Sequence, residues 1–251
     1  MKWIVRFMDV LSCLVILWYF VFLLPKMVEN GKAMRLLAQR RSSFQALERN
    51  AVQSGLSPFG FPPNDITDSN GLPLLSWRVA FLQEISRCGE YGDILSRFNF
   101  QENWLSPQNL EASKQRPNFY FYPYYLEKSK PTLTCMVLVK EIADWKRSGN
   151  YGKGHIQDKA LVILIDPEYA VPWTAPTTDV SWQDLANGKI KPFVTNGYIH
   201  YLKAWDLLPE TGAAKCPESY EEWENLCGVP SWVIESHQNK SHESETTTKQ
   251  Q

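Results

Sequence analysis

The sequence predicts an α+β fold in which a long N-terminal membrane-anchored helix packs on an antiparallel sheet. Three observations lead to this class. An apolar run near the start continues into a segment with helical periodicity, a second and shorter helical segment follows, and the β-rich runs come only after a long loop. Strands that are grouped after helices, rather than alternating with them, are typical of an antiparallel sheet.

The anchor is predicted from residues 10–24, which are 15 residues without a charge. At 1.5 Å per residue they span about 22 Å, and extension back to Trp3 gives about 33 Å, enough for a hydrocarbon core. A cleaved signal peptide is the alternative, but no small-x-small cleavage site follows Leu24. More basic residues follow the run than precede it, which by the positive-inside rule places the carboxyl side in the cytoplasm.

A helical stalk is predicted after Pro25, because apolar residues recur at spacings of three, four or seven and Gly55 and Pro58 then end the pattern. The apolar stripe consists of Met27, Met34, Leu37, Phe44 and Ala51. The solvated side is assigned to Arg40, Arg41, Glu48 and Arg49. Two interpretations stay open: the stripe packs on its own domain, or on copies of itself in an assembly.

The remaining elements follow in chain order. Residues 76–88 are apolar at Val79, Leu82 and Ile85, which predicts a short helix that Gly89 ends. The β-rich runs 133–140 and 160–165 predict strands. Residues 193–194 and 198–202 predict a hairpin around the turn pair at 196–197, and the Pro- and Asn-rich segment 99–125 predicts a loop.

Composition limits the partners. The chain has 251 residues, 26 basic and 27 acidic, so it is not predicted to bind nucleic acid. Residues 236–251 hold no aliphatic or aromatic side chain and are predicted to be a disordered tail. The expected organisation is therefore an anchor at 1–25, a helical stalk at 26–55, an α+β domain at 56–235 and the tail at 236–251.

Five motifs resemble one family in their order and spacing over about residues 20–208. They are a Leu-Leu-Pro helix end at 23–25, Phe-Pro-Pro at 61–63, Gly-x-Pro-Leu-Leu-Ser-Trp-Arg-Val at 71–79, an Asn-Trp-Leu-Ser-Pro-Gln-Asn loop at 103–109 and Ala-Val-Pro-Trp-Thr-x-Pro at 170–176. The family is the bacterial pseudopilin-like family of unknown function, DUF fifteen-fifty-nine, which is similar to type II secretion and type IV pilin proteins. The resemblance implies a pilin-like fold, a single membrane pass with the N-terminus in the cytoplasm and the domain outside it, and self-association or pairing with other pilin-like proteins. It also implies structural roles for Ser76, Trp77, Arg78, Trp104, Ser106, Pro107, Pro172, Trp173 and Thr174.

The N-terminus departs from the family pattern. The glycine that precedes the peptidase-cleaved segment of pilins is missing, and Asp9 lies 16 residues before Pro25 instead of the glutamate at 17. The family's later Asp-Gly pair is also missing, and Leu105 replaces a loop aspartate. These differences indicate a diverged member whose anchor is not removed.

Cysteines are the first candidates for chemistry. Four lie in the predicted soluble part, an even number that allows two disulfides in an oxidising compartment. A Cys216–Cys227 bridge would close a local loop, which leaves Cys88 and Cys135 as the second pair. The alternative is that Cys88 and Cys135 are buried free thiols.

No constellation in the sequence supports catalysis. There is no G-x-S-x-G, H-E-x-x-H or phosphate-loop motif and no C-x-x-C pair, so we predict no enzyme, cofactor, metal or small-molecule substrate. His200, on an aromatic strand, is expected to be a packed core histidine. The glycine-rich segment 149–154 precedes a strand rather than a helix and is expected to be a turn.

The aromatic run at 119–125 allows a second function. Alternate rings Tyr120, Tyr122 and Tyr124 could stack on a glycan or protein, or could cover the core. The predicted function is therefore a non-enzymatic, membrane-anchored pseudopilin-like component of a secretion- or pilus-like assembly. The alternative is an anchored extracytoplasmic binding module that uses aromatic loops.

Overall fold

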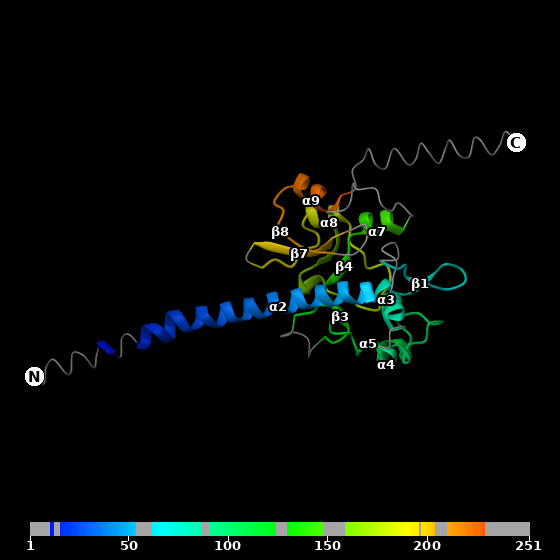
Figure 1. The fold of residues 1–251 in the computed structure, drawn as a ribbon, viewed down its shortest axis with the longest axis horizontal. Coiled ribbons are helices and arrows are strands. Elements are labelled where there is room, and N and C mark those ends of the chain that lie inside the picture. The colour runs from blue at the N-terminus through cyan, green and yellow to red at the C-terminus, as the bar shows by residue number, and fades with distance from the viewer. Residues whose placement is uncertain are drawn as a thin grey trace, which may run out of the picture. The chain divides into compact units, whose positions relative to one another are not determined.

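The computed structural model has an α+β fold with a long N-terminal helix and antiparallel sheets, which confirms the α+β part of the predicted class (Figure 1). The structure describes residues 11–12, 16–53, 62–86, 91–123, 130–147, 159–195, 197–203 and 210–228. Contacts divide the chain into two compact units, Met1–Gln39 and Arg40–Gln251. The predicted tail at 236–251 and the glycine-rich segment 149–154 lie outside the described residues.

The first unit is helical where it is described. A π-helical turn, η1 (Tyr19–Leu23), leads directly into helix α2 (Leu24–Gln53). Pro25 has no N–H to donate to the carbonyl four residues earlier, and a π turn is a common local adjustment in a helix that contains such a break. Among the described helices, none has both the length and the apolar character needed to cross a membrane. Residues 1–10 and 13–15 of the predicted anchor are outside the described residues.

Helix α2 ends in the second unit, where its apolar stripe is buried. Phe44, Leu47 and Ala51 are all within the core, so this part of the stripe packs on its own domain. The placement of Arg40 on the solvated side is wrong, because its side chain is 0% exposed. Arg40 precedes Phe44 by four residues and Leu47 by seven, so helical geometry puts all three on one face. Arg40 is therefore buried because of its position on the helix, despite its charge.

The core sheet has four antiparallel strands in the order β4-β5-β7-β8. Their bounds are Met136–Leu138 for β4, Ala160–Leu164 for β5, Tyr198–Lys203 for β7 and Glu210–Lys215 for β8. All five residues of β5 are buried, which explains its continuous run of apolar residues. The strand predicted at 160–165 is confirmed.

The predicted strand at 133–140 is two strands in different sheets. β3 (Leu133–Thr134) pairs with β6 (Val171–Pro172), whereas β4 pairs with β5. The chain changes partner at Cys135, whose N–H donates to the carbonyl of Phe121 at 2.8 Å. The Thr134 hydroxyl accepts from the Met136 N–H at 3.1 Å, a local bond that competes with the ladder.

The turn of the predicted hairpin is confirmed, but the predicted pairing of residues 193–194 with residues 198–202 is wrong. Thr195 and Tyr198 exchange both backbone hydrogen bonds, at 2.9 and 3.0 Å, and Gly197 has φ +80°. However, the N–H of Phe193 donates to the carbonyl of Leu164 at the end of β5, so residues 193–194 do not form a strand beside β7. β7 pairs instead with β8, which the sequence did not predict.

Short helices and a small sheet complete the second unit. Helix α3 (Trp77–Ser86) confirms the helix predicted at 76–88, of which 87–88 lie outside the described residues. The others are α4 (Gly92–Leu95), α5 (Pro107–Ser113), α7 (Lys140–Arg147), η2 (Pro167–Tyr169), α8 (Trp182–Ala186) and α9 (Tyr220–Cys227), with β1 (Ile66–Thr67) beside β2 (Pro73–Leu75). Within this unit, Figure 1 shows α8 and α9 together at one end and α3, α4 and α5 at the other.

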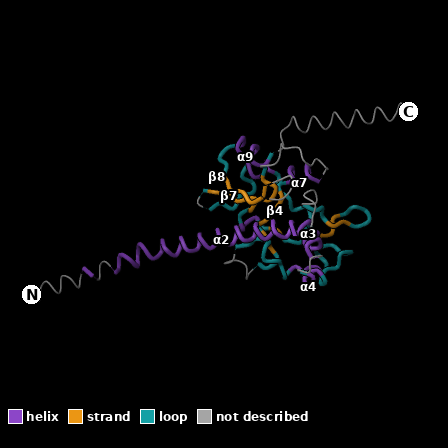
Figure 2. Tube along the Cα trace, viewed as in Figure 1, coloured by secondary structure: helices purple, strands orange, loops and turns teal. Residues whose placement is uncertain are grey.

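The segment predicted as loop, 99–125, contains helix α5. Ser106 is the N-cap and Pro107 the first helical residue, a combination that favours a helix start. The rest of the described segment is irregular, and Figure 2 shows that loops make up much of the trace in this unit.

Candidate functional site

Two of the motifs meet at the start of helix α3. The Ser76 hydroxyl donates to the carbonyl of Trp173 at 2.6 Å, and the Ser76 N–H donates to the carbonyl of Thr174 at 3.0 Å. Ser76 and Thr174 are buried, so these bonds are shielded from water. The Leu-Leu-Ser-Trp-Arg and Val-Pro-Trp-Thr sequences, about 97 residues apart, therefore form one structural unit. Pro172 lies in β6 and pairs with Leu133.

Asp65 strengthens this junction and was missed by the sequence analysis. Its carboxylate accepts from the Trp77 N–H at 2.5 Å and from the Thr177 N–H at 2.9 Å. It thus satisfies a free amide at the first turn of α3 and ties the 170–178 segment to it. Its partners are 12 and 112 positions away, so no local spacing could have indicated this role.

Arg78 lies at the centre of the motif cluster. Its guanidinium donates through Nε and Nη2 to the carbonyl of Met136, at 3.0 and 2.5 Å, and through Nη1 to the Thr178 hydroxyl at 2.9 Å. It also lies 4.8 Å from the Trp77 ring centroid. Burial lowers the pKa of Arg78 to about 10, and nearby Asp179 opposes that shift. Arg78 therefore joins α3 to the core sheet as a cation whose donors have partners.

Aromatic rings pack around this cluster. The Trp173 indole N–H donates to the carbonyl of Ser113 at 2.7 Å, and its ring stacks on Tyr120 at 5.8 Å. The Tyr120 hydroxyl donates to the backbone carbonyl of Arg78 at 2.5 Å, and burial raises its pKa well above the usual value. Trp77 meets Tyr120 edge to face at 6.4 Å. These rings form a continuous core and present no stacking surface.

The aromatic candidates for ligand binding are buried where they are described. Tyr120 and Tyr122 are at most 1% exposed, and neither lies on a strand. They cover the core, the second of the two interpretations, so these two rings cannot stack on a ligand in this structure. Tyr124 lies outside the described residues.

The loop motif at 103–109 is held by one asparagine. Asn109 accepts from the Asn99 N–H at 2.8 Å and donates to the carbonyls of Asn99, Glu102 and Asn103, each at 3.0 Å. The backbone N–H of Trp104 donates to the carbonyl of Leu74 at 2.9 Å, which places this loop beside the 71–79 motif. The sequence analysis assigned roles to Trp104, Ser106 and Pro107 but missed Asn109. Its place as the last residue of the 103–109 motif was the available signal.

The cysteine candidates are thiols. Cys135, Cys216 and Cys227 are free, so the predicted Cys216–Cys227 bridge is not formed, and Cys88 lies outside the described residues. Cys135 is buried, as the alternative prediction had it. Burial raises the pKa of Cys227 to about 12, and Cys216 lies beside a mostly apolar hollow of about 330 Å³. Burial raises the pKa of all three thiols, and at Cys135 and Cys227 it outweighs the nearby cations Arg116 and Lys159, so none of the three is an activated thiol.

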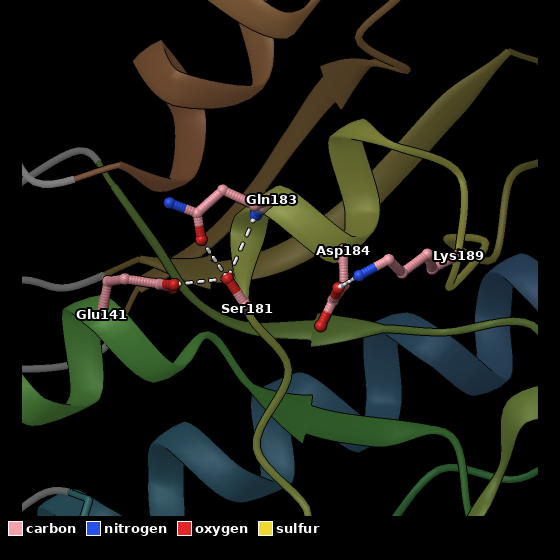
Figure 3. Close-up of polar contacts among 5 residues, drawn as sticks. All are labelled: Glu141, Ser181, Gln183, Asp184 and Lys189. Atoms are coloured by element: carbon pink, nitrogen blue, oxygen red, sulfur yellow. Dashed lines mark hydrogen bonds and ion pairs between the residues drawn. The ribbon is translucent and has the colours of Figure 1, made fainter.

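The clearest polar cluster outside the motifs joins two helices (Figure 3). The Ser181 hydroxyl donates to Oε1 of Glu141 at 2.6 Å, and Oε2 of the same carboxylate accepts from the Trp182 N–H at 3.2 Å. Ser181 is the N-cap of α8 and accepts from the Gln183 N–H at 3.3 Å. A serine beside a carboxylate can resemble a catalytic pair, but these groups are engaged in capping the helix. Asp184, one turn on, pairs with Lys189 at 2.9 Å.

His200 is half-buried on β7, and its pKa is lowered to about 4 by burial and by the charges of Arg40 and Arg41. It is therefore neutral at pH 7. Across the described residues, His, Cys, Asp and Glu side chains do not gather into a group that could hold a metal ion. His155, His237 and His242 are outside that part of the chain.

Comparison of the chain with protein-family models, with curated proteins and with solved structures found no match. The pseudopilin-like resemblance therefore stays a prediction from the motifs.

Proposed function

We propose that this chain is a non-enzymatic, membrane-anchored pseudopilin-like protein and a structural component of a secretion- or pilus-like assembly. In this proposal the N-terminus is cytoplasmic, a single helix crosses the membrane, and the Arg40–Gln251 unit is extracytoplasmic. The membrane and other copies or pilin-like chains are the partners.

The observation that carries the proposal is the exposed apolar surface of the first unit. The nine residues from Ile16 to Leu24 are all apolar or aromatic, and each is 36–59% exposed. They are consecutive, so they cover every side of the helix rather than one stripe. A surface of this kind in water costs about 25 cal/mol for each Å² of apolar area, which favours insertion into lipid.

The motif cluster supports a structural rather than catalytic role. Ser76, Arg78 and Trp173 of the motifs are buried and donate to backbone carbonyl groups. No motif residue in the described part supplies a nucleophile next to a base, as covalent catalysis would require.

Membrane attachment is tested with the full chain carrying a carboxyl-terminal tag, by alkaline carbonate extraction of membranes. We expect the wild-type chain to stay with the membrane and a Phe20→Asp/Phe22→Asp variant to leave it. Tyr198→Asp is the matched control, since Tyr198 is an exposed aromatic of the second unit. Release of the wild-type chain by carbonate would refute the anchor.

Orientation is tested by protease digestion of the tag in cells whose outer barrier is permeabilised, with the mass of the membrane-bound protein measured in parallel. Digestion with an intact N-terminus is expected. Protection of the tag would place the second unit in the cytoplasm, as the distribution of basic residues alone predicts.

Assembly is tested with Leu37→Asp, which we expect to disperse the oligomer of the detergent-solubilised chain in light scattering. Gln45→Asp, at an exposed position of the same helix, is the control. An unchanged oligomer in Leu37→Asp would remove the assembly role of this stripe.

A further inference from the structure

Arg40 is a buried cation in which two of the three guanidinium nitrogens have no hydrogen-bond partner. The side chain is 0% exposed, yet Nε and Nη2 have no hydrogen-bond partner. Within the described part of the chain, its guanidinium makes one long hydrogen bond, from Nη1 to the carbonyl of Phe193 at 3.4 Å, and one cation–π contact, with the Phe193 ring at 5.2 Å. An unpaired charge in the interior is costly, and buried polar groups are rarely left without partners.

The unused donors form one edge of the guanidinium. Nε–H and the adjacent N–H of Nη2 point in the same direction, which is the fork that binds two oxygens of one anion. At Arg78 the same edge, Nε and Nη2, holds the carbonyl of Met136. Of the two arginines that are buried in the described part of the chain, one therefore has this edge occupied and the other has it free.

No acidic group of the described residues compensates Arg40. Burial lowers its pKa to about 10, with no carboxylate opposing that shift, whereas Asp179 and Asp65 oppose it at Arg78. The charged and titratable groups that act together near this point are Arg40, Arg41 and His200, and the imidazole is neutral at pH 7. Among the described residues, the charge at this point is thus positive and has no counter-charge.

We propose that the free edge of Arg40 is a binding site for one carboxylate group, held by Nε–H and Nη2–H above the Phe193 ring. A carboxylate has one negative charge and two oxygens in a plane, which match one cation and two parallel donors. A phosphate dianion would bring a second charge and further acceptors into a setting with a neutral histidine and an aromatic ring, where they would lack partners. This inference does not depend on the proposed function.

Two sources can deliver the group: a small carboxylate from solution, or an acidic side chain of a second copy of this chain. Because the guanidinium is closed off from solvent, entry requires local opening of the packing around it. Binding should therefore be slow, and samples must be equilibrated before measurement.

The test is thermal unfolding of the full chain in detergent at pH 7, followed by tryptophan fluorescence. Sodium acetate is compared with sodium chloride and with inorganic phosphate at equal ionic strength. We expect the Tm of the wild type to rise with acetate and level off, since a ligand that binds the folded state stabilises it. Arg40→Met should abolish the rise, while Arg41→Met, at the exposed neighbouring arginine, should keep it.

Arg40→Lys keeps the positive charge but loses the two parallel N–H donors, so it should also show no rise of Tm with acetate. It replaces Arg40→Met in the test if Arg40→Met does not fold. If acetate has no effect, but light scattering shows self-association of the wild type that both Arg40 variants lose, the carboxylate comes from a second copy. Equal rises in wild type and Arg40→Met, a rise with phosphate as large as with acetate, or no effect on either Tm or association would overturn the proposal.

Discussion

Replacement of each buried arginine by methionine tests the central energetic argument. Arg78→Met and Arg40→Met remove the same group and substitute a flexible apolar side chain of similar length. The two sites differ in one respect that matters. Arg78 makes three hydrogen bonds to two acceptors, and Arg40 makes one of 3.4 Å.

The cost of Arg78→Met follows from the acceptors that it leaves behind. The buried carbonyl of Met136 and the Thr178 hydroxyl each lose a charged donor, and hydrogen bonds to charged groups contribute about 1.5–3 kcal/mol each. The gross loss is therefore about 3–6 kcal/mol. Removal of a buried charge returns part of it, so we expect a net loss of about 2–4 kcal/mol.

The change in unfolding free energy caused by Arg40→Met should be opposite in sign to that of Arg78→Met, or close to zero. It loses a weak hydrogen bond and a cation–π contact, together about 1–2 kcal/mol. It also removes a buried charge for which the described residues supply no counter-charge, and the desolvation of such a charge costs several kcal/mol. We expect stability between unchanged and about 2 kcal/mol higher.

Urea unfolding of the full chain in detergent and chloride buffer, followed by tryptophan fluorescence, measures both variants on one scale. The near-ultraviolet circular dichroism of each variant controls for a native core. Arg78→Met should be less stable than Arg40→Met by at least about 2 kcal/mol. If Arg40→Met loses as much stability as Arg78→Met, then the Arg40 donors have partners in the folded protein and the reasoning fails.

Three further outcomes are expected. Asn109→Ala should cost about 2–3 kcal/mol in urea unfolding, because it removes one hydrogen bond from each of four backbone groups. Gln108→Ala at an exposed site should stay within about 0.5 kcal/mol. Similar costs for both variants would contradict the role of Asn109. The pKa of His200 is lowered from 6.5 to about 4 in the folded protein, so its contribution to stability should be complete above pH 6.5 and should be lost as the pH falls toward 4. His200→Gln should therefore flatten the dependence of the unfolding free energy on pH in this range. An unchanged slope in that variant would show that other groups cause it. Iodoacetamide should modify half-buried Cys216 well before Cys227, because the Cys227 thiol is buried and has a pKa raised to about 12; mass spectrometry measures both. If neither thiol is labelled and the protein mass is two hydrogens lower, then the predicted Cys216–Cys227 disulfide is present.

The candidate site was only partly accessible from the sequence. The motif analysis identified Ser76, Arg78 and Trp173, because each lies in a distinctive run of residues. It could not identify Asp65, which acts on amides 12 and 112 positions away. A carboxylate that caps a distant segment leaves no periodic or local pattern, and only the folded chain brings the partners together.

The sequence by itself determined the elements whose signals are local. The periodicity that ends in Phe44, Leu47 and Ala51 predicted helix α2, and the apolar run at 160–165 predicted β5, since helical and strand geometry impose these spacings within a few residues. Only the tertiary structure decided strand partners and the burial of charge. Cys135 separates two sheets, β7 pairs with β8, and Arg40 enters the core, because pairing and burial depend on which distant segments meet.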